Sequence, residues 1–237
     1  MTEVTGLRPS TVKAWIVDIF QQPFGDLLEF PVDEIQVGQM TPETAAHPVI
    51  AVKLTAVLGK SRQRVDLDVS FGSVIHPGTC VLTYPQLVIP EAVQLRAYAL
   101  EQIVAEKFAA MIELNVGNTR MKDFHDLWQI ARYDPPEPVP GESARGMRAA
   151  DLGEAMSRSF AVRQTPLADL PYFLSGAFAQ DEEILEEWQR YRRRNAWAQL
   201  PEFAAVMASV RVFPGEVAQS LPLKTDGIWN PGTQRWE

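Results

Sequence analysis

The chain has 237 residues, of which 46% are hydrophobic and 22% are charged, so it can bury a full core as one large domain or two small ones. Its single cysteine, Cys80, excludes an internal disulfide framework and favours a reducing, cytoplasmic setting. The first residues lack a basic start, and no segment approaches the ~20 apolar residues of a membrane span. We therefore expect neither a signal peptide nor a membrane helix.

The charge and the metal-ligating residues argue against two classes of function. A net charge of −8 argues against a protein coated for nucleic-acid binding, although it leaves room for a small basic patch. His47, His76 and His125 are scattered along the sequence, and neither they nor Cys80 have the spacing of zinc ligands. We expect no zinc site.

The N-terminal part of the sequence predicts one helix followed by strands. An amphipathic helix is expected over residues 10–21, capped by Ser10 or Thr11 and ended by Pro23. Extended runs follow at residues 27–37, 49–58 and 62–71.

Turn residues set the connections between these runs. The last two runs are joined by Gly59, Lys60 and Ser61, a short turn that predicts a hairpin. Pro31 lies within the first run, so part of that run is expected at a sheet edge or in a bulge. Residues 73–92 contain several prolines and are expected to wrap the sheet loosely. A short final strand is predicted from Val93 to Tyr98.

The C-terminal part has the apolar spacing of helices, which are predicted at residues 99–115, 121–132, 147–160, 180–199 and 201–219. Pro214 should interrupt the last of them. The proline-rich segment 134–146 is typical of a linker. The tail after Leu221 is expected to be irregular, with Trp229 and Trp236 holding it in place.

Early strands and late helices predict an α+β protein, in which a small antiparallel sheet unit precedes a helical unit. We place the boundary after Tyr98. This gives an α+β core over residues 1–98 and a helical domain over residues 99–237.

Two carboxylates share one face of the predicted strand 62–71. Apolar residues alternate there with Arg64, Asp66, Asp68 and Ser70, which is typical of a sheet with one solvated face. Asp66 and Asp68 point the same way and repel each other unless a cation relieves them, so a Mg²⁺ site is the alternative interpretation.

Lys107 lies inside the apolar stripe of the predicted helix 99–115, next to Val104, Phe108 and Met111. One interpretation is a packed side-chain stem whose ammonium reaches solvent. The alternative is an ammonium that contacts a nucleotide phosphate in an adjoining cleft.

Asp123 and Asp126 fall in the first turn of the next predicted helix, where acids complement the helix dipole and where Arg120 and Lys122 can balance them. A role in a functional site is the alternative. His125, between the two acids, is expected to be a partly exposed helix residue, with contact to substrate as the alternative.

Four arginines fall within five positions near the end of the predicted helix 180–199: Arg190, Arg192, Arg193 and Arg194. Glu186 and Glu187 precede Arg190 at helical pairing distance, which favours a solvated, salt-bridged face. A patch for the RNA backbone is the alternative.

Two stretches resemble the AbiEii/AbiGii toxin family of nucleotidyltransferases: LDVSFGSVIHP and RAYALEQIVAEKFAAMIELNVGNTRMKDFHDLW. The resemblance covers about residues 10–200, and the block AEKF…NTRMKDFHDLW is its most specific part. It implies a polymerase-β-like core with an added helical domain, a nucleoside triphosphate substrate, Mg²⁺, and transfer of a nucleotide to RNA, notably tRNA ends. It also implies a separately encoded antitoxin as partner, usually a DNA-binding winged-helix protein, within a toxin–antitoxin or abortive-infection system.

Residue by residue, the resemblance assigns Asp68 as a metal or base carboxylate. Lys107 is the lysine that contacts the triphosphate, and Asp123 is the acid that orients it or assists proton transfer. Asp126 matches the second acid of that helix, and it and Arg120 are expected to help bind the nucleotide.

The sequence departs from the family upstream of Asp68, where the opening Gly-Gly or Gly-Ser turn and Asp-x-Asp strand have no counterpart. Asp66-Leu67-Asp68 does not replace that motif, because the few residues after Gly59 leave no room for the helix that presents the phosphates. The Gly-Asp that follows the strand in the family is Gly72-Ser73 here.

Two explanations of this departure remain open. Either the first strands are encoded upstream of Met1, or the chain is a remnant that has lost catalysis and still binds nucleotide or antitoxin. A purely structural helical adaptor is a third interpretation.

Overall fold

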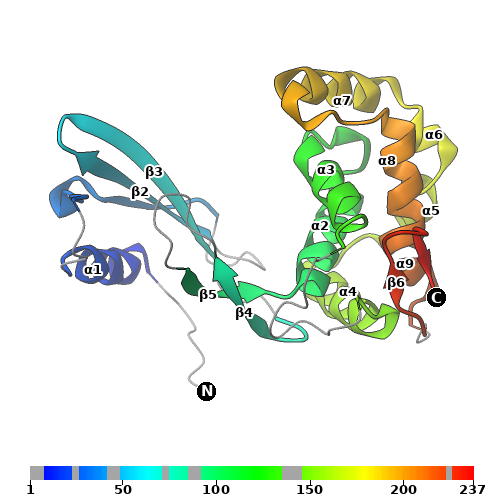
Figure 1. The fold of residues 1–237 in the computed structure, drawn as a ribbon, viewed down its shortest axis with the longest axis horizontal. Coiled ribbons are helices and arrows are strands. Elements are labelled where there is room, and N and C mark those ends of the chain that lie inside the picture. Colours follow the sequence, from blue (N-terminus) through cyan, green and yellow to red (C-terminus); the bar gives the residue numbers. More distant parts are fainter. Residues whose placement is uncertain are drawn as a thin grey trace. The chain divides into compact units, whose positions relative to one another are not determined.

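The computed structural model describes residues 8–22, 27–41, 49–70, 75–84, 92–134, 146–222 and 226–237. Its contacts divide the chain into two compact units, Met1–Ser73 and Val74–Glu237, which we describe one after the other. The fold is α+β, as predicted, with small antiparallel sheets and many helices (Figure 1). This division lies earlier in the chain than the predicted boundary after Tyr98. The segment that ends at Tyr98 therefore belongs to the same unit as the helices that follow it.

The first unit begins with helix α1 (Pro9–Phe20). Ser10 and Thr11 were expected to cap it, but its N-cap is Arg8, without a side-chain hydrogen bond. The reason is that Pro9 occupies the first helical position, where its fixed φ suits the helix and its missing N–H leaves no donor unpaired. Pro23, the predicted stop, lies outside the described residues.

The sheet of the first unit is antiparallel, in the order β1 (Gln36–Gln39), β2 (Val49–Leu58), β3 (Ser61–Ser70). The predicted hairpin is confirmed: Leu58 pairs with Ser61, and Gly59 takes a φ of 59° in the two-residue turn. A small core joins the sheet to α1 and contains Val12, Ile35, Ile50, Val52 and Leu54.

The predicted extended run 27–37 is mostly not a strand. It makes one bridge, between Glu29 and Val57, and then a 3₁₀ turn (Val32–Glu34) before β1 begins at Gln36. Pro31 precedes that turn and has no N–H to donate to a ladder, which explains why the strand starts late.

The second unit opens with an antiparallel pair, β4 (Thr79–Tyr84) and β5 (Val93–Tyr98). The final strand is therefore confirmed, but residues 79–84 form a strand instead of a loose wrap. They include Thr79, Val81 and Thr83, whose β-branched side chains favour extended backbone despite the prolines on either side.

Helices form the rest of the second unit (Figure 1): α2 (Leu100–Leu114), α3 (Met121–Ile130), α4 (Ala149–Arg163), α5 (Leu170–Phe173), α6 (Gly176–Ala179), α7 (Glu182–Arg194), α8 (Phe203–Val210) and α9 (Glu216–Ser220). The five predicted helices are present, and the short α5 and α6 were not predicted. Pro214 interrupts the last helix as expected, inside a π-helical segment (Arg211–Gly215). Within the proposed linker, residues 135–145 lie outside the described residues. None of the described helices is long and apolar enough to cross a membrane.

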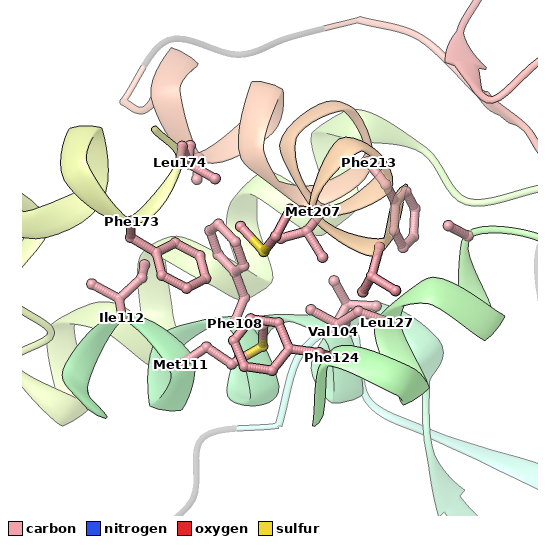
Figure 2. Close-up of a cluster of buried hydrophobic side chains, with 14 of the residues drawn as sticks. Val104, Phe108, Met111, Ile112, Phe124, Leu127, Phe173, Leu174, Met207 and Phe213 are labelled. Atoms are coloured by element: carbon pink, nitrogen blue, oxygen red, sulfur yellow. The ribbon is translucent and has the colours of Figure 1, made fainter. Parts of the chain in front are cut away.

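A large aromatic and aliphatic cluster fixes the orientation of α3 (Figure 2). Phe124 is fully buried at its centre, and its ring centroid lies 5.1 Å from that of Phe203 and 6.3 Å from those of Phe173 and Phe178. Because α3 packs against α2, α7 and α8, this ring sets which way the neighbouring polar residues of α3 face.

The C-terminal tail forms a short hairpin, β6 (Trp229–Asn230) and β7 (Arg235–Trp236), and not the expected irregular segment. Its predicted anchoring is confirmed. Trp229 Nε1 donates to the carbonyl oxygen of Ala131 at 2.7 Å, and Trp236 Nε1 donates to those of Val212 and Phe213 at 3.1 and 3.0 Å.

We expect Trp229→Phe to lower the free energy of unfolding by about 1 kcal/mol, the usual net contribution of one hydrogen bond. The loss should be no larger, because the Ala131 carbonyl also accepts a bond from Gln234 Nε2 at 2.7 Å. Urea unfolding followed by circular dichroism measures this change. An unchanged midpoint would show that the bond does not hold the tail.

Candidate functional site

The candidate site is an ion cluster between α2 and α3. Lys107 Nζ lies 2.8 Å from Asp123 Oδ1 and 2.7 Å from Asp126 Oδ2. Asp123 and Asp126 are three positions apart at the start of α3, so they share one face of that helix and reach the ammonium together. The structure therefore unites three of the predicted site residues.

The position of Lys107 follows from the packing of α2. Val104, Phe108 and Met111 are fully buried on the same helix, while the Lys107 side chain keeps 22% of its surface exposed. Its stem thus packs along the core, and its ammonium meets the two carboxylates at the edge of that core.

Burial lowers the pKa of Lys107, but the hydrogen bonds and charges of Asp123 and Asp126 outweigh this effect and raise it above its ordinary value of 10.5. Lys107 is therefore a permanent cation at neutral pH. It can neutralise or position an anion, but it cannot serve as a general base.

Two further cations flank the cluster. Arg120 Nε lies 3.1 Å from Asp123 Oδ2, and Lys122 Nζ lies 3.6 Å from Asp126 Oδ2. The side chains of Arg120 and Lys122 are 60% and 74% exposed. The three cations and two carboxylates leave the cluster with one net positive charge, and its exposed charges are the cationic ones.

The outer oxygen of Asp123 is poorly satisfied. Its side chain is only 4% exposed, and Oδ2 accepts no hydrogen bond from the described residues, because the nearby Arg120 is close but not aligned. Asn118, in the turn before α3, likewise has a buried Nδ2 without a partner in the described part of the chain. Unsatisfied buried polar atoms are uncommon, so each calls for an explanation such as strain, a bound water or ion, or a catalytic role.

His125 was expected to be partly exposed, and this was wrong, because α7 covers it and leaves it 5% exposed. Its Nδ1 lies 2.9 Å from the hydroxyl oxygen of Tyr191 on α7, and its Nε2 is buried without a described partner. Sequence reasoning missed Tyr191, whose only signal was its place three residues after Trp188 on the apolar side of α7.

We expect stability to depend on pH through His125, whose pKa is lowered below 6.5 mainly by burial, against the raising charge of Asp126. The unfolded chain then binds a proton near pH 6.5 that the folded chain binds only at lower pH. The stabilisation is therefore complete above pH 6.5 and is lost as the pH falls towards the folded pKa.

Thermal unfolding of the wild type and of His125→Asn at about pH 7.5 and about pH 5.5, on either side of the ordinary histidine pKa, measures this dependence. The temperature midpoint of unfolding should fall less in the variant than in the wild type between the higher and the lower pH. An equal fall in both proteins would show that His125 does not contribute to the pH dependence of stability.

The other predicted carboxylates, Asp66 and Asp68, belong to the first unit. They lie on the exposed face of β3, where Asp66 pairs across the sheet with Lys53 and its Oδ1 lies 2.8 Å from Arg64 Nη2. Within the described residues Asp68 makes no ion pair, and its cross-strand neighbour is the small Ala51.

The donor chemistry of this strand suits Mg²⁺, which commonly takes one or two carboxylates and completes its shell with water and substrate phosphates. Asp68 is available for this, whereas Asp66 would have to leave Arg64. In the described ranges, no group of three or more His, Cys, Asp or Glu residues is arranged to hold a metal. The strand thus offers at most a two-carboxylate site.

The arginines of α7 divide into two kinds. Arg190 pairs with Glu187, and Arg192 pairs with Glu202, as a salt-bridged face predicts. Arg193 and Arg194 are exposed and make no ion pair or hydrogen bond with the described part of the chain.

A clamped lysine with two exposed basic neighbours has the charge and the hydrogen-bond donors that an anion such as a phosphate requires. Comparison with known families identifies the class of protein: the model of the family "Nucleotidyl transferase AbiEii toxin, Type IV TA system" matches residues 7–209. The chain belongs to this family of nucleotidyl transferase toxins, and the resemblance seen in the sequence is confirmed. No curated protein and no solved structure matches it.

Proposed function

We propose that the chain is a nucleotidyltransferase that moves a nucleotide from a nucleoside triphosphate to an RNA acceptor, a tRNA end in particular. It would act in the cytoplasm as the toxin of a pair, opposed by a separately encoded, winged-helix DNA-binding antitoxin. The family match supports the reaction class. The ion pairs of Lys107 with Asp123 and Asp126 are the observation on which the choice of site residues rests.

In this proposal the cation cluster binds the triphosphate. The Lys107 ammonium contacts a phosphate oxygen, and the exposed Arg120 and Lys122 contribute further positive charge around it. Asp123 and Asp126 hold the ammonium in place, so its position is fixed before the substrate arrives. Catalysis then comes mainly from positioning and charge neutralisation, as in other phosphoryl transfers.

The reaction joins the acceptor hydroxyl oxygen to the α-phosphorus and breaks the bond from that phosphorus to the bridging oxygen, which leaves with pyrophosphate. The hydroxyl proton passes to a carboxylate or to water. We propose Asp68 either as that carboxylate or, together with Asp66, as a ligand of Mg²⁺, which would neutralise charge on the phosphate oxygens.

Incubation with Mg²⁺, a tRNA pool and each of the α-labelled nucleoside triphosphates in turn tests this proposal. The wild type should label RNA with at least one triphosphate. The double variant Lys107→Met with Asp123→Asn should not label RNA. The control variant Arg158→Gln removes an exposed arginine on α4, away from the cluster, and should label RNA as the wild type does. Absence of labelled RNA with every triphosphate would refute the transfer reaction for this chain.

A second candidate is a protein that binds nucleotide or antitoxin without chemistry. The ion pair of Asp66 with Arg64 favours it, because this pairing opposes metal binding by one of only two carboxylates on the strand. This candidate predicts triphosphate binding that depends on Lys107 together with no labelled RNA. Measuring triphosphate binding and RNA labelling on one preparation distinguishes the transferase from the binding protein.

A further inference from the structure

The end of α7 and the turn after it carry an exposed combination of charge and ring surface. Trp197 is 78% exposed, more than any other described aromatic side chain. It follows Arg193 and Arg194, the two arginines of α7 without partners among the described residues. We call these three residues the α7 surface.

Fold stability accounts for only part of this arrangement. Basic residues near a helix C-terminus interact favourably with the helix dipole, which explains some of the arginines. A large indole left in water contributes almost none of its burial energy to the fold, however, and Arg190 and Arg192 show that carboxylate partners can be supplied on this helix. The unpaired arginines and the exposed ring are therefore available for a ligand.

The turn that presents Trp197 is well ordered by backbone hydrogen bonds. Asn195 N–H donates to the carbonyl of Tyr191 at 3.0 Å, and its side-chain Nδ2 donates to the same oxygen at 2.9 Å. The 3₁₀ turn (Ala196–Ala198) is closed by Ala198 N–H donating to the carbonyl of Asn195 at 2.9 Å. The ring thus sits on a fixed support, which limits the entropy lost when a ligand stacks on it.

We propose that the α7 surface binds a single-stranded nucleic acid. One base stacks on the indole of Trp197, and the guanidinium groups of Arg193 and Arg194 bind the neighbouring phosphates. Aromatic rings beside free cations are the usual means of binding single strands without sequence readout. The rest of the chain carries an excess of negative charge, which repels nucleic acid from other surfaces and favours this one.

The inference rests on the proposed function, because it assigns a surface for the acceptor RNA. The α7 surface and the Lys107 cluster belong to the same packed unit: α7 contacts α3 and the 3₁₀ turn (Asn115–Gly117) that leads to it. Tyr191, two residues before Arg193, contacts His125, which lies between the two carboxylates of the cluster.

Fluorescence anisotropy of a short fluorescein-labelled single-stranded RNA, titrated with the full chain, tests the inference. Trp197→Ala should weaken binding between about fivefold and about a hundredfold, the range for losing one stacked base. Arg193→Gln with Arg194→Gln should lower the slope of log affinity against log salt by about 1.4, since each phosphate contact on a single strand contributes about 0.7.

Helix α1 offers a matched control, because it also carries an exposed tryptophan, Trp15, and two exposed cations, Arg8 and Lys13. Trp15→Ala, and Arg8→Gln with Lys13→Gln, should leave the affinity within about twofold of wild type, as expected of residues outside the interface. Equal weakening by both sets of variants, or no effect of the α7 variants, would overturn the inference. This assay does not measure transfer, so the binding surface and the transfer reaction can fail separately.

Discussion

Replacing Lys107 with methionine should lower the free energy of unfolding by about 3 kcal/mol and weaken triphosphate binding at least about tenfold. The stability loss arises because Asp123, with a side chain 4% exposed, would keep a buried charge without its hydrogen-bonded partner. The binding loss arises because a charge-assisted contact to phosphate disappears, which alone weakens affinity at least about tenfold. Urea unfolding and calorimetric titration with triphosphate measure the two effects.

A double variant separates these effects. Lys107→Met with Asp123→Asn also removes the buried charge that has lost its hydrogen-bonded partner, and it should recover much of the stability without recovering triphosphate binding. Lys122→Met is the matched control for a lysine at the cluster edge: its side chain is 74% exposed, and its stability should change by less than about 1 kcal/mol. If Lys107→Met changed stability alone and left triphosphate binding intact, Lys107 would be a structural residue.

Replacing Phe124 with alanine should destabilise the second unit by about 3–5 kcal/mol, the range for truncating a buried phenylalanine. The ring is fully buried and contacts Phe173, Phe178 and Phe203, so its removal leaves a cavity between helices. It also follows Asp123 directly in the chain. We therefore expect α3 to shift and triphosphate affinity to fall along with stability.

Thermal unfolding and the triphosphate titration check this prediction. Phe124→Leu is the conservative control, and its loss should be no more than about 1.5 kcal/mol because most of the apolar volume remains. A loss below about 1 kcal/mol for Phe124→Ala would mean that the cluster does not hold α3 in place.

The inner part of the candidate site could be predicted from the sequence because its residues are close in the chain. Helical spacing placed Lys107 on an apolar stripe, and the three-residue spacing of Asp123 and Asp126 placed both acids on one face. A single short loop joins the two helices, so their polar residues had few other partners. These local patterns placed the three residues, and the packing of α2 against α3 then forms their ion pairs.

The contacts of His125 could not be predicted, because they depend on α7 folding back over α3. Tyr191 is 66 positions away in the chain, and no local pattern links it to His125. The short helices α5 and α6 were missed for a related reason: four residues contain too little periodicity to be recognised, and packing among Phe173, Phe178 and Phe124 determines them. Strand β4 was missed because flanking prolines suggested a loop.

The central claim is that the α2–α3 ion cluster binds the substrate phosphates. The most direct test is to titrate two proteins, the wild type and the double variant Lys107→Met with Asp123→Asn, with each nucleoside triphosphate in the presence of Mg²⁺. The claim predicts saturable binding by the wild type and an affinity at least about tenfold lower in the folded variant. Equal affinity in the two proteins would contradict it.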